Sequence, residues 1–142
     1  MNNSTTHVIV GAGPIGSGTA LRLAAAGHSV VIVTRSGSGP DHASIELVAA
    51  DAADQARLTD IAVGADTIYN CANPPYHRWA TDWAPLASSL LGAAETTGAR
   101  LVTMSNLYMY AADSSPMRAT DPLDPPSKKG AIRAQMWRDA LG

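Results

Sequence analysis

Three glycines near the N-terminus constrain the fold of this chain more than any other feature. Gly11, Gly13 and Gly16 have the spacing G-x-G-x-x-G, between an apolar run at residues 8–10 and a helix-forming stretch at residues 15–26. In such a turn the first glycine permits a tight bend and the second lets the main chain approach a ligand closely. The third lets the helix pack on the strand. The pattern predicts a strand–helix unit whose helix N-terminus binds a pyrophosphate.

We therefore expect a dinucleotide at this loop, contacted by the three glycines and by Pro14 and Ile15 of the first helical turn. Glycine spacing alone is weak evidence, because glycine-rich loops produce it by chance. Here a strand precedes it, a helix follows, and a second apolar run comes at residues 30–33. The alternative is a strand–helix turn that binds nothing.

Apolar runs alternate with helix-forming stretches along the rest of the chain. Further strands are expected at residues 29–34, 45–49, 66–71 and 100–105. Helices are expected after Asp54, at residues 85–97 and at residues 131–141. Such alternation is typical of parallel strands joined by right-handed crossovers. We expect an α/β fold of the Rossmann type, a doubly wound parallel sheet of five strands in the order 3-2-1-4-5, with the ligand at the carboxyl ends of strands 1 and 4.

The length of 142 residues suits one domain, residues 1–142, with one hydrophobic core. Four prolines make residues 106–129 irregular in this prediction. The last helix would normally lead to another strand, so we expect the cofactor-binding half of a longer architecture without its substrate lobe. A complete small domain is the alternative.

The composition of the chain limits the kinds of molecule that we expect it to bind. The formal net charge is −2, which gives no footprint for a nucleic acid, and Cys71 is the only cysteine. The polar N-terminus does not resemble a signal peptide, and no apolar stretch reaches the roughly 18 residues that a membrane span needs. The four histidines lack metal-ligand spacing. We expect a cytoplasmic protein that binds a small-molecule substrate, and neither a nucleic acid, a membrane nor a metal.

The residues after the second strand indicate which dinucleotide is preferred. NAD-binding versions of this fold place a carboxylate there, which accepts a hydrogen bond from the ribose 2′-hydroxyl. This chain has Thr34, Arg35 and Ser36 instead. A guanidinium can bind a 2′-phosphate bidentately, so we expect NADP in preference to NAD. The alternative for Arg35 is a solvated loop cation.

Other cofactor contacts are expected where the third and fourth strands end. Asp51, followed by Ala52, could accept a hydrogen bond from the adenine amino group or could serve as a turn or helix-cap residue. The chain leaves the fourth strand where the ribose and nicotinamide should pass, from Asn70 through Cys71 and Ala72 to Asn73, and we expect the backbone groups of these residues beside the cofactor. We interpret Cys71 as a small buried group and not as a nucleophile.

The GAGPIG loop, Asp51, the apolar fourth strand and the segment LVTMSNLYMYA together resemble the extended short-chain dehydrogenase/reductases. More narrowly, the chain resembles the NAD-dependent epimerase/dehydratase family, over nearly all of its length but only the N-terminal half of a usual member. The resemblance implies an oxidoreductase or epimerase/dehydratase that acts on a carbonyl or sugar-like small molecule. It also implies a possible homodimer through the helix after Trp83 and the final helix.

The family's catalytic pattern is not reproduced in this chain. The resemblance implies a serine or threonine after strand five and a Tyr-x-x-x-Lys motif, whose lysine helps to lower the pKa of the tyrosine. No Tyr-x-x-x-Lys occurs here, and Lys129 and Arg133 stand at the two motif positions. Asn106 stands at the serine position, or Ser105 after a shift of one residue. The candidate catalytic residues are Ser105, Asn106, Tyr108, Tyr110, Lys129 and Arg133.

Several roles remain open for these residues. Tyr108 or Tyr110 could supply a phenol whose pKa a nearby cation lowers, or Tyr110 could pack under the loop. Lys129 and Arg133 could hold a phosphate or carboxylate, or could be solvated cations. The aromatic residues Tyr76, Trp79 and Trp83 could line a substrate pocket or pack beneath the following helix. A non-catalytic NADP-binding or redox-sensing module, similar to NmrA-like proteins, and a truncated inactive cofactor domain are the alternatives to an enzyme.

Overall fold

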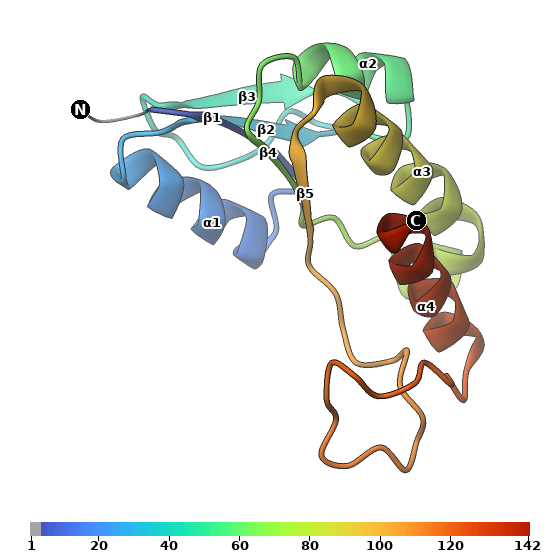
Figure 1. Cartoon of the computed structure of the whole chain (residues 1–142). Helices are drawn as coiled ribbons and strands as arrows, with labels where there is room; N and C mark the ends of the chain where they lie inside the picture. The colour runs from blue at the N-terminus through green and yellow to red at the C-terminus, as the bar shows by residue number, and fades with distance from the viewer. Residues whose placement is uncertain (1–3) are drawn as a thin grey trace. The chain divides into compact units, whose positions relative to one another are not determined.

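The computed structural model describes residues 4–142, which contain a five-stranded, entirely parallel sheet (Figure 1). Its strands are β1 Thr6–Val10, β2 Ser29–Thr34, β3 Ile45–Ala49, β4 Thr67–Asn70 and β5 Arg100–Thr103. They lie in the order β3-β2-β1-β4-β5. The predicted fold class and strand order are therefore confirmed.

The helices connect these strands and follow the last of them. They are α1 Pro14–Ala25, α2 Gln55–Ile61, the short 3-10 helix η1 Tyr76–Arg78, α3 Trp79–Thr97 and α4 Lys128–Leu141. In Figure 1, α1 covers one face of the sheet and α2 lies on the other. None of the helices in residues 4–142 combines the length and the apolar character that crossing a bilayer requires.

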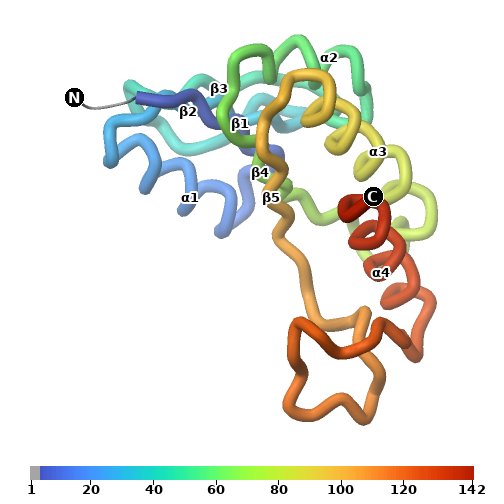
Figure 2. Tube along the Cα trace, in the orientation of Figure 1, coloured from blue at the N-terminus to red at the C-terminus, as the bar shows by residue number. Residues whose placement is uncertain are grey.

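The described chain divides into two compact units. The first unit runs to Asn73 and includes Leu86–Met104, so it contains the whole sheet, α1 and α2. The second unit consists of Pro74–Pro85 and Ser105–Gly142. It contains η1, the beginning of α3, a long irregular segment and α4, and Figure 2 traces that segment into α4.

The core of the first unit forms where α1 packs on the central strands. Ile9 of β1 and Ile32 of β2 are register partners, and both are fully buried. Ala20 and Ala24 of α1 complete the same cluster. Small alanine side chains let the helix axis lie close to the sheet, which brings the N-terminus of α1 to the carboxyl end of β1.

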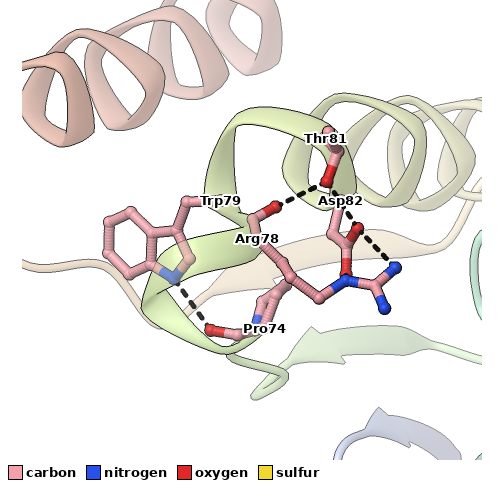
Figure 3. A network of polar contacts seen from close by, with 5 residues as sticks. All are labelled: Pro74, Arg78, Trp79, Thr81 and Asp82. Atoms are coloured by element: carbon pink, nitrogen blue, oxygen red, sulfur yellow. Dashed lines mark hydrogen bonds and ion pairs between the residues drawn. The ribbon is translucent and has the colours of Figure 1, made fainter.

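The beginning of α3 differs from the prediction, which started this helix at Pro85. The helix begins at Trp79 and includes Pro85 in its interior. Arg78 forms an ion pair with Asp82 at 2.9 Å, and the Trp79 indole N–H donates to the Pro74 carbonyl at 2.8 Å (Figure 3). Burial of Trp79 and these polar contacts offset the hydrogen bond that a proline removes from a helix.

The beginning of α4 also lies earlier than predicted. The helix starts at Lys128 instead of Ala131, because Ser127 is its N-cap and accepts a hydrogen bond from the Gly130 amide at 3.1 Å. The predicted fourth and fifth strands were each two residues too long, since β4 is Thr67–Asn70 and β5 is Arg100–Thr103. Both strands end where the chain turns into irregular backbone.

Candidate functional site

The first glycine of the loop adopts a conformation that other residues rarely adopt. Gly11 has φ +101° and donates its amide hydrogen to the Val33 carbonyl at 3.0 Å. A Cβ atom at this position would lie 2.8 Å from the Cys71 carbonyl oxygen and 2.9 Å from Ala72. The loop therefore turns directly off β1 and packs against the chain that leaves β4, as the predicted tight turn requires.

The other two glycines have different surroundings. A Cβ atom on Gly16 would overlap the carbonyl oxygen of Gly11, so Gly16 permits the close contact between α1 and the loop. A Cβ atom on Gly13 would meet nothing within 4 Å. Gly13 therefore leaves its side of the main chain open, which is where a pyrophosphate approaches in a dinucleotide-binding turn.

The N-terminus of α1 offers hydrogen-bond donors to an anion. Gly13 is the N-cap, no side chain of the described residues caps this end, and the first turn has no acidic residue. Ser17 donates its hydroxyl hydrogen to the Ala12 carbonyl at 2.9 Å, which holds the loop against the helix. Backbone N–H groups and the helix dipole favour a phosphate here, so these residues fit a dinucleotide pyrophosphate.

The loop after β2 is an ordered turn with an exposed cation. The Thr34 hydroxyl accepts from the Ser38 amide at 2.9 Å and donates to the Ser38 carbonyl at 3.2 Å. The hydroxyl oxygens of Ser36 and Ser38 are 2.9 Å apart. Arg35 is exposed at the carboxyl end of β2. The turn thus brings two hydroxyl groups and a guanidinium to one short segment.

The residues after β3 form a turn that leads into α2. One carboxylate oxygen of Asp51 accepts from the Ala53 amide at 3.0 Å, and the Asp51 carbonyl accepts from the Asp54 amide at 3.0 Å. Asp54 is the N-cap of α2. Asp51 is exposed and Ala52 is buried. Asp51 therefore stabilises the turn. This is one of the two roles that the sequence left open, the other being a contact with adenine.

The carboxyl end of β4 carries the buried polar side chain of Asn70, a residue that the sequence placed near the cofactor through its backbone alone. Asn70 is 2% exposed, and its side-chain oxygen has no hydrogen-bond partner within residues 4–142. Next to it, Cys71 is half-buried, and burial raises the pKa of its thiol. A raised pKa keeps the thiol protonated, which agrees with the interpretation of Cys71 as a packing residue. Ala72 and Asn73 continue the chain out of the strand. A polar residue at the end of an apolar run was the available signal for Asn70.

Six residues of the second unit form what we call the tyrosine–cation cluster: Tyr76, Trp79, Trp83, Tyr108, Lys129 and Arg133. The hydroxyl oxygens of Tyr76 and Tyr108 are 3.4 Å apart. The ring of Tyr76 lies on Trp79, with centroids 5.0 Å apart. The Lys129 ammonium lies 5.8 Å from the centroid of the Tyr76 ring. Two phenols and an ammonium group therefore share one small region.

Arg133 has a different environment from Lys129. It is only 5% exposed, and its guanidinium lies 4.7 Å from the ring centroid of Trp83 and 5.7 Å from that of Trp79. Burial lowers the pKa of Arg133 from its usual value. An arginine nevertheless remains charged at neutral pH, and a face-on aromatic ring stabilises that charge. Arg133 is therefore not a solvated cation at the start of the helix.

Close packing fixes the first turn of α4 against Tyr108. A Cβ atom on Gly130 would overlap the Tyr108 carbonyl oxygen and would lie 2.6 Å from Pro125 Cβ. Only glycine permits this approach without a shift of the main chain. Because Lys129 precedes Gly130, the same contact helps to hold the lysine over the Tyr76 ring.

The remaining catalytic candidates lie outside this cluster. Asn106 accepts a hydrogen bond from the Tyr108 amide at 3.1 Å through its side-chain oxygen, which is a turn contact. Ser105 is exposed and Tyr110 is half-buried. Of the six sequence candidates, the structure brings together Tyr108, Lys129 and Arg133. It adds Tyr76, which the sequence suggested only as a pocket wall; the aromatic residues directly after the fourth strand were the available signal.

The sequence and the fold of this chain are similar to those of known proteins. The model of the NAD dependent epimerase/dehydratase family matches residues 7–131. The crystal structure of the Bordetella bronchiseptica enzyme WbmH in complex with NAD+ matches with a TM-score of 0.84 and 23% identity, over 98% of this chain and 52% of that chain. A UDP-galactose 4-epimerase matches with a TM-score of 0.76 and 30% identity, over 92% of this chain and 48% of that chain.

Uronate dehydrogenase from Agrobacterium tumefaciens has the same fold, with a TM-score of 0.81, 21% identity, and coverage of 99% of this chain and 55% of that chain. The chain thus spans about half the length of these solved structures. Among curated proteins, none matches the sequence.

Proposed function

The chain belongs to the NAD-dependent epimerase/dehydratase family, and on this premise we propose that it binds a nicotinamide dinucleotide and exchanges hydride with a sugar-like small molecule. The observation that carries the proposal is the contrast among the loop glycines. Gly11 and Gly16 are closed in by the main chain, whereas Gly13 is open. An open main chain beside the uncapped N-terminus of α1 suits a diphosphate. When bound, the dinucleotide supplies the hydride chemistry, and the protein orients it.

The preferred dinucleotide in this proposal is NADP. Arg35 is exposed beside the hydroxyl groups of Ser36 and Ser38, and the end of β2 has no carboxylate to repel a 2′-phosphate. Several solved relatives are complexes with NAD, so the proposal gives this chain a different dinucleotide from the one in those structures. A bidentate guanidinium–phosphate contact is charge-assisted and stronger than a neutral hydrogen bond.

A fluorescence titration of the chain with NADPH and with NADH tests both statements. We expect tighter binding of NADPH in the wild type and a reversed preference in Arg35→Asp, because the new carboxylate repels the phosphate and accepts from a ribose hydroxyl. Arg22→Asp, at the other end of α1, makes the same charge change on an exposed residue and should keep the wild-type preference. Unchanged selectivity in Arg35→Asp would contradict the NADP assignment.

The substrate class in this proposal is a sugar or a sugar nucleotide. The support comes from relatives named as a UDP-galactose 4-epimerase, a UDP-glucose 4-epimerase and a uronate dehydrogenase. Suitable probes are therefore UDP-galactose for epimerisation and glucuronate for oxidation.

A second candidate function is a dinucleotide-binding module without catalysis. It is favoured by one observation, the replacement of the Tyr-x-x-x-Lys pair by Lys129 and Arg133. This candidate predicts that the chain binds NADPH and turns over neither probe, whereas the enzyme predicts turnover of at least one of them.

A further inference from the structure

We propose that the second unit binds an oxyanion, the carboxylate or phosphate group of a small molecule, through the Tyr76 hydroxyl and the Lys129 ammonium. Tyr76 lies in η1 and Lys129 lies in the first turn of α4. Tyr108, which assists Tyr76, lies in the irregular segment before α4. All three residues belong to the second unit, so the inference goes beyond the proposed function and does not depend on the dinucleotide loop.

The two phenols form a chain of hydrogen-bond donors that ends at Tyr76. Their hydroxyl oxygens are 3.4 Å apart. The hydrogen bond with Tyr76 raises the pKa of Tyr108, so Tyr108 keeps its proton and donates it to the Tyr76 oxygen. The Tyr76 hydroxyl hydrogen is then left to donate to a ligand, since this hydroxyl has no other partner within residues 4–142. The bond from Tyr108 polarises it and makes it a stronger donor.

Lys129 adds a positive charge that lacks a counterion within the second unit. Its ammonium lies 5.8 Å from the centroid of the Tyr76 ring. The ion pairs formed within residues 4–142 involve other residues, so no carboxylate neutralises this ammonium there. A lysine ammonium is a compact charge that suits a phosphate or a carboxylate. A cation and a hydroxyl donor beside one aromatic ring therefore favour an oxyanion.

Packing contacts fix the positions of these groups. The Tyr76 ring lies on Trp79, with centroids 5.0 Å apart and an interplanar angle of 31°. Trp79 is 2% exposed and donates its indole N–H to the Pro74 carbonyl at 2.8 Å (Figure 3). A Cβ atom on Gly130 would overlap the Tyr108 carbonyl oxygen, so the first turn of α4 is packed closely on Tyr108. Donors that are already ordered lose little conformational entropy when a ligand binds.

The donor set and its exposure indicate the class of ligand. An ammonium has only hydrogens to offer, and the Tyr76 oxygen already accepts from Tyr108, so the ligand must accept from both groups. An oxyanion accepts from both and gains the attraction of the charge, whereas a neutral hydroxyl compound gains no charge attraction. Tyr76 is 54% exposed and Tyr108 is 44% exposed, so a small molecule can reach the hydroxyl directly.

Calorimetric titration of the chain in the absence of a dinucleotide tests the inference, with glucuronate, glucose and inorganic phosphate as probes. Glucose has a hydroxymethyl group where glucuronate has its carboxylate, so this pair isolates the effect of the charge. We expect at least one oxyanion to bind at millimolar concentrations and glucose not to bind. Binding of glucuronate would assign a carboxylate ligand, and binding of phosphate alone would assign a phosphate ligand. Added sodium chloride should weaken the binding, because salt screens an exposed charge.

Variants locate the site on the second unit. Lys129→Met keeps most of the side chain and removes the charge, so it should weaken binding by about tenfold or more. Lys128→Met removes the neighbouring exposed cation and should bind like the wild type. Tyr76→Phe should weaken binding by about tenfold, because it removes a hydrogen bond to a charged group. Tyr108→Phe should weaken it by only about threefold, because Tyr108 acts through Tyr76.

The outcomes separate this inference from the proposed function. A chain that binds an oxyanion but neither dinucleotide would overturn the proposed function and leave this site in place. A chain that binds NADPH but neither oxyanion would overturn this site alone. Equal affinities of Lys129→Met and Lys128→Met would also overturn it. Circular dichroism would check that each variant folds, and if Lys129→Met does not, an unchanged affinity in Tyr76→Phe would overturn the site.

Discussion

The guanidinium of Arg133 lies 4.7 Å from the ring centroid of Trp83, and both residues are almost completely buried. The resemblance to the family predicted Arg133 at the position of the motif lysine, a residue expected near the reacting groups. In this chain the cation is instead enclosed by two indole rings. Arg133 therefore packs α4 against the beginning of α3.

This contact predicts a stability change that depends on the cation. Arg133→Met should lower the free energy of unfolding by about 2 kcal/mol, since it removes a desolvated cation–π contact while keeping most of the side-chain volume. Urea unfolding followed by tryptophan fluorescence would measure the change. Arg118→Met, at an exposed position, is the matched control. Equal stability of the two variants would mean that the indole rings do not stabilise the charge.

Two helical glycines should respond in opposite ways to the same substitution. Gly130→Ala should destabilise the chain by about 1–3 kcal/mol, because the added Cβ overlaps the Tyr108 carbonyl oxygen. Gly18→Ala in α1 should stabilise it by up to about 1 kcal/mol, because its Cβ meets nothing within 4 Å and alanine favours helix.

Urea unfolding of both glycine variants tests the packing of α4 on Tyr108. A stabilising Gly130→Ala would show that the first turn of α4 does not contact Tyr108 as described. The tyrosine–cation cluster would then lack the contact that holds Lys129 in place.

A buried histidine predicts how stability depends on pH. The hydroxyl oxygen of Thr5 lies 2.8 Å from His7 Nε2 and 3.0 Å from His28 Nδ1. Burial lowers the pKa of His7, the His28 charge lowers it further, and Asp66 opposes this effect. The unfolded chain therefore binds a proton at His7 more readily than the folded chain does. The free energy of unfolding consequently falls as the pH drops below the ordinary histidine pKa of about 6.5.

Unfolding measured between neutral pH and about pH 5 isolates this effect, because carboxyl groups ionise mainly below that window. The pKa of Asp66 is lowered, first by its hydrogen bond from Thr67, so its stabilising effect is lost only at still lower pH. His7→Gln should flatten the pH dependence in the window. His77→Gln, at an exposed residue, should retain it. A steep dependence that survives in His7→Gln would assign the effect to another group.

The sheet could be predicted from the sequence because the patterns that indicate strands and turns lie within short stretches of the chain. Gly11 and Gly16 have the tight turn and the close helix contact expected of them, and β2 and β3 have the predicted bounds. Helix α3 was predicted, but its first turns, which begin at Trp79, were missed because proline is usually found at a helix start. Contacts that a sequence does not display, between Trp79, Pro74 and the residues around them, stabilise the extra turns.

The candidate site likewise has one part that could be predicted from the sequence and one part that could not. The residues proposed to contact the cofactor follow strand ends, so their place in the fold could be predicted from the order of strands. The pairing of Tyr76 with Tyr108 joins two segments that are far apart in the sequence, and no periodicity reports such a contact. The burial of Arg133 likewise depends on two indole rings contributed by another helix.

The most direct test of the central claim is the NADPH affinity of Gly13→Ala, measured by equilibrium titration beside the wild type and Gly18→Ala. Gly13 has room for a Cβ atom in the protein alone, so the variant should fold normally. Its affinity should fall at least tenfold, about 1.4 kcal/mol, because the methyl group occupies the approach of the pyrophosphate. Gly18→Ala should bind like the wild type. Equal affinity of Gly13→Ala and the wild type would contradict the claim that the diphosphate lies on this glycine loop.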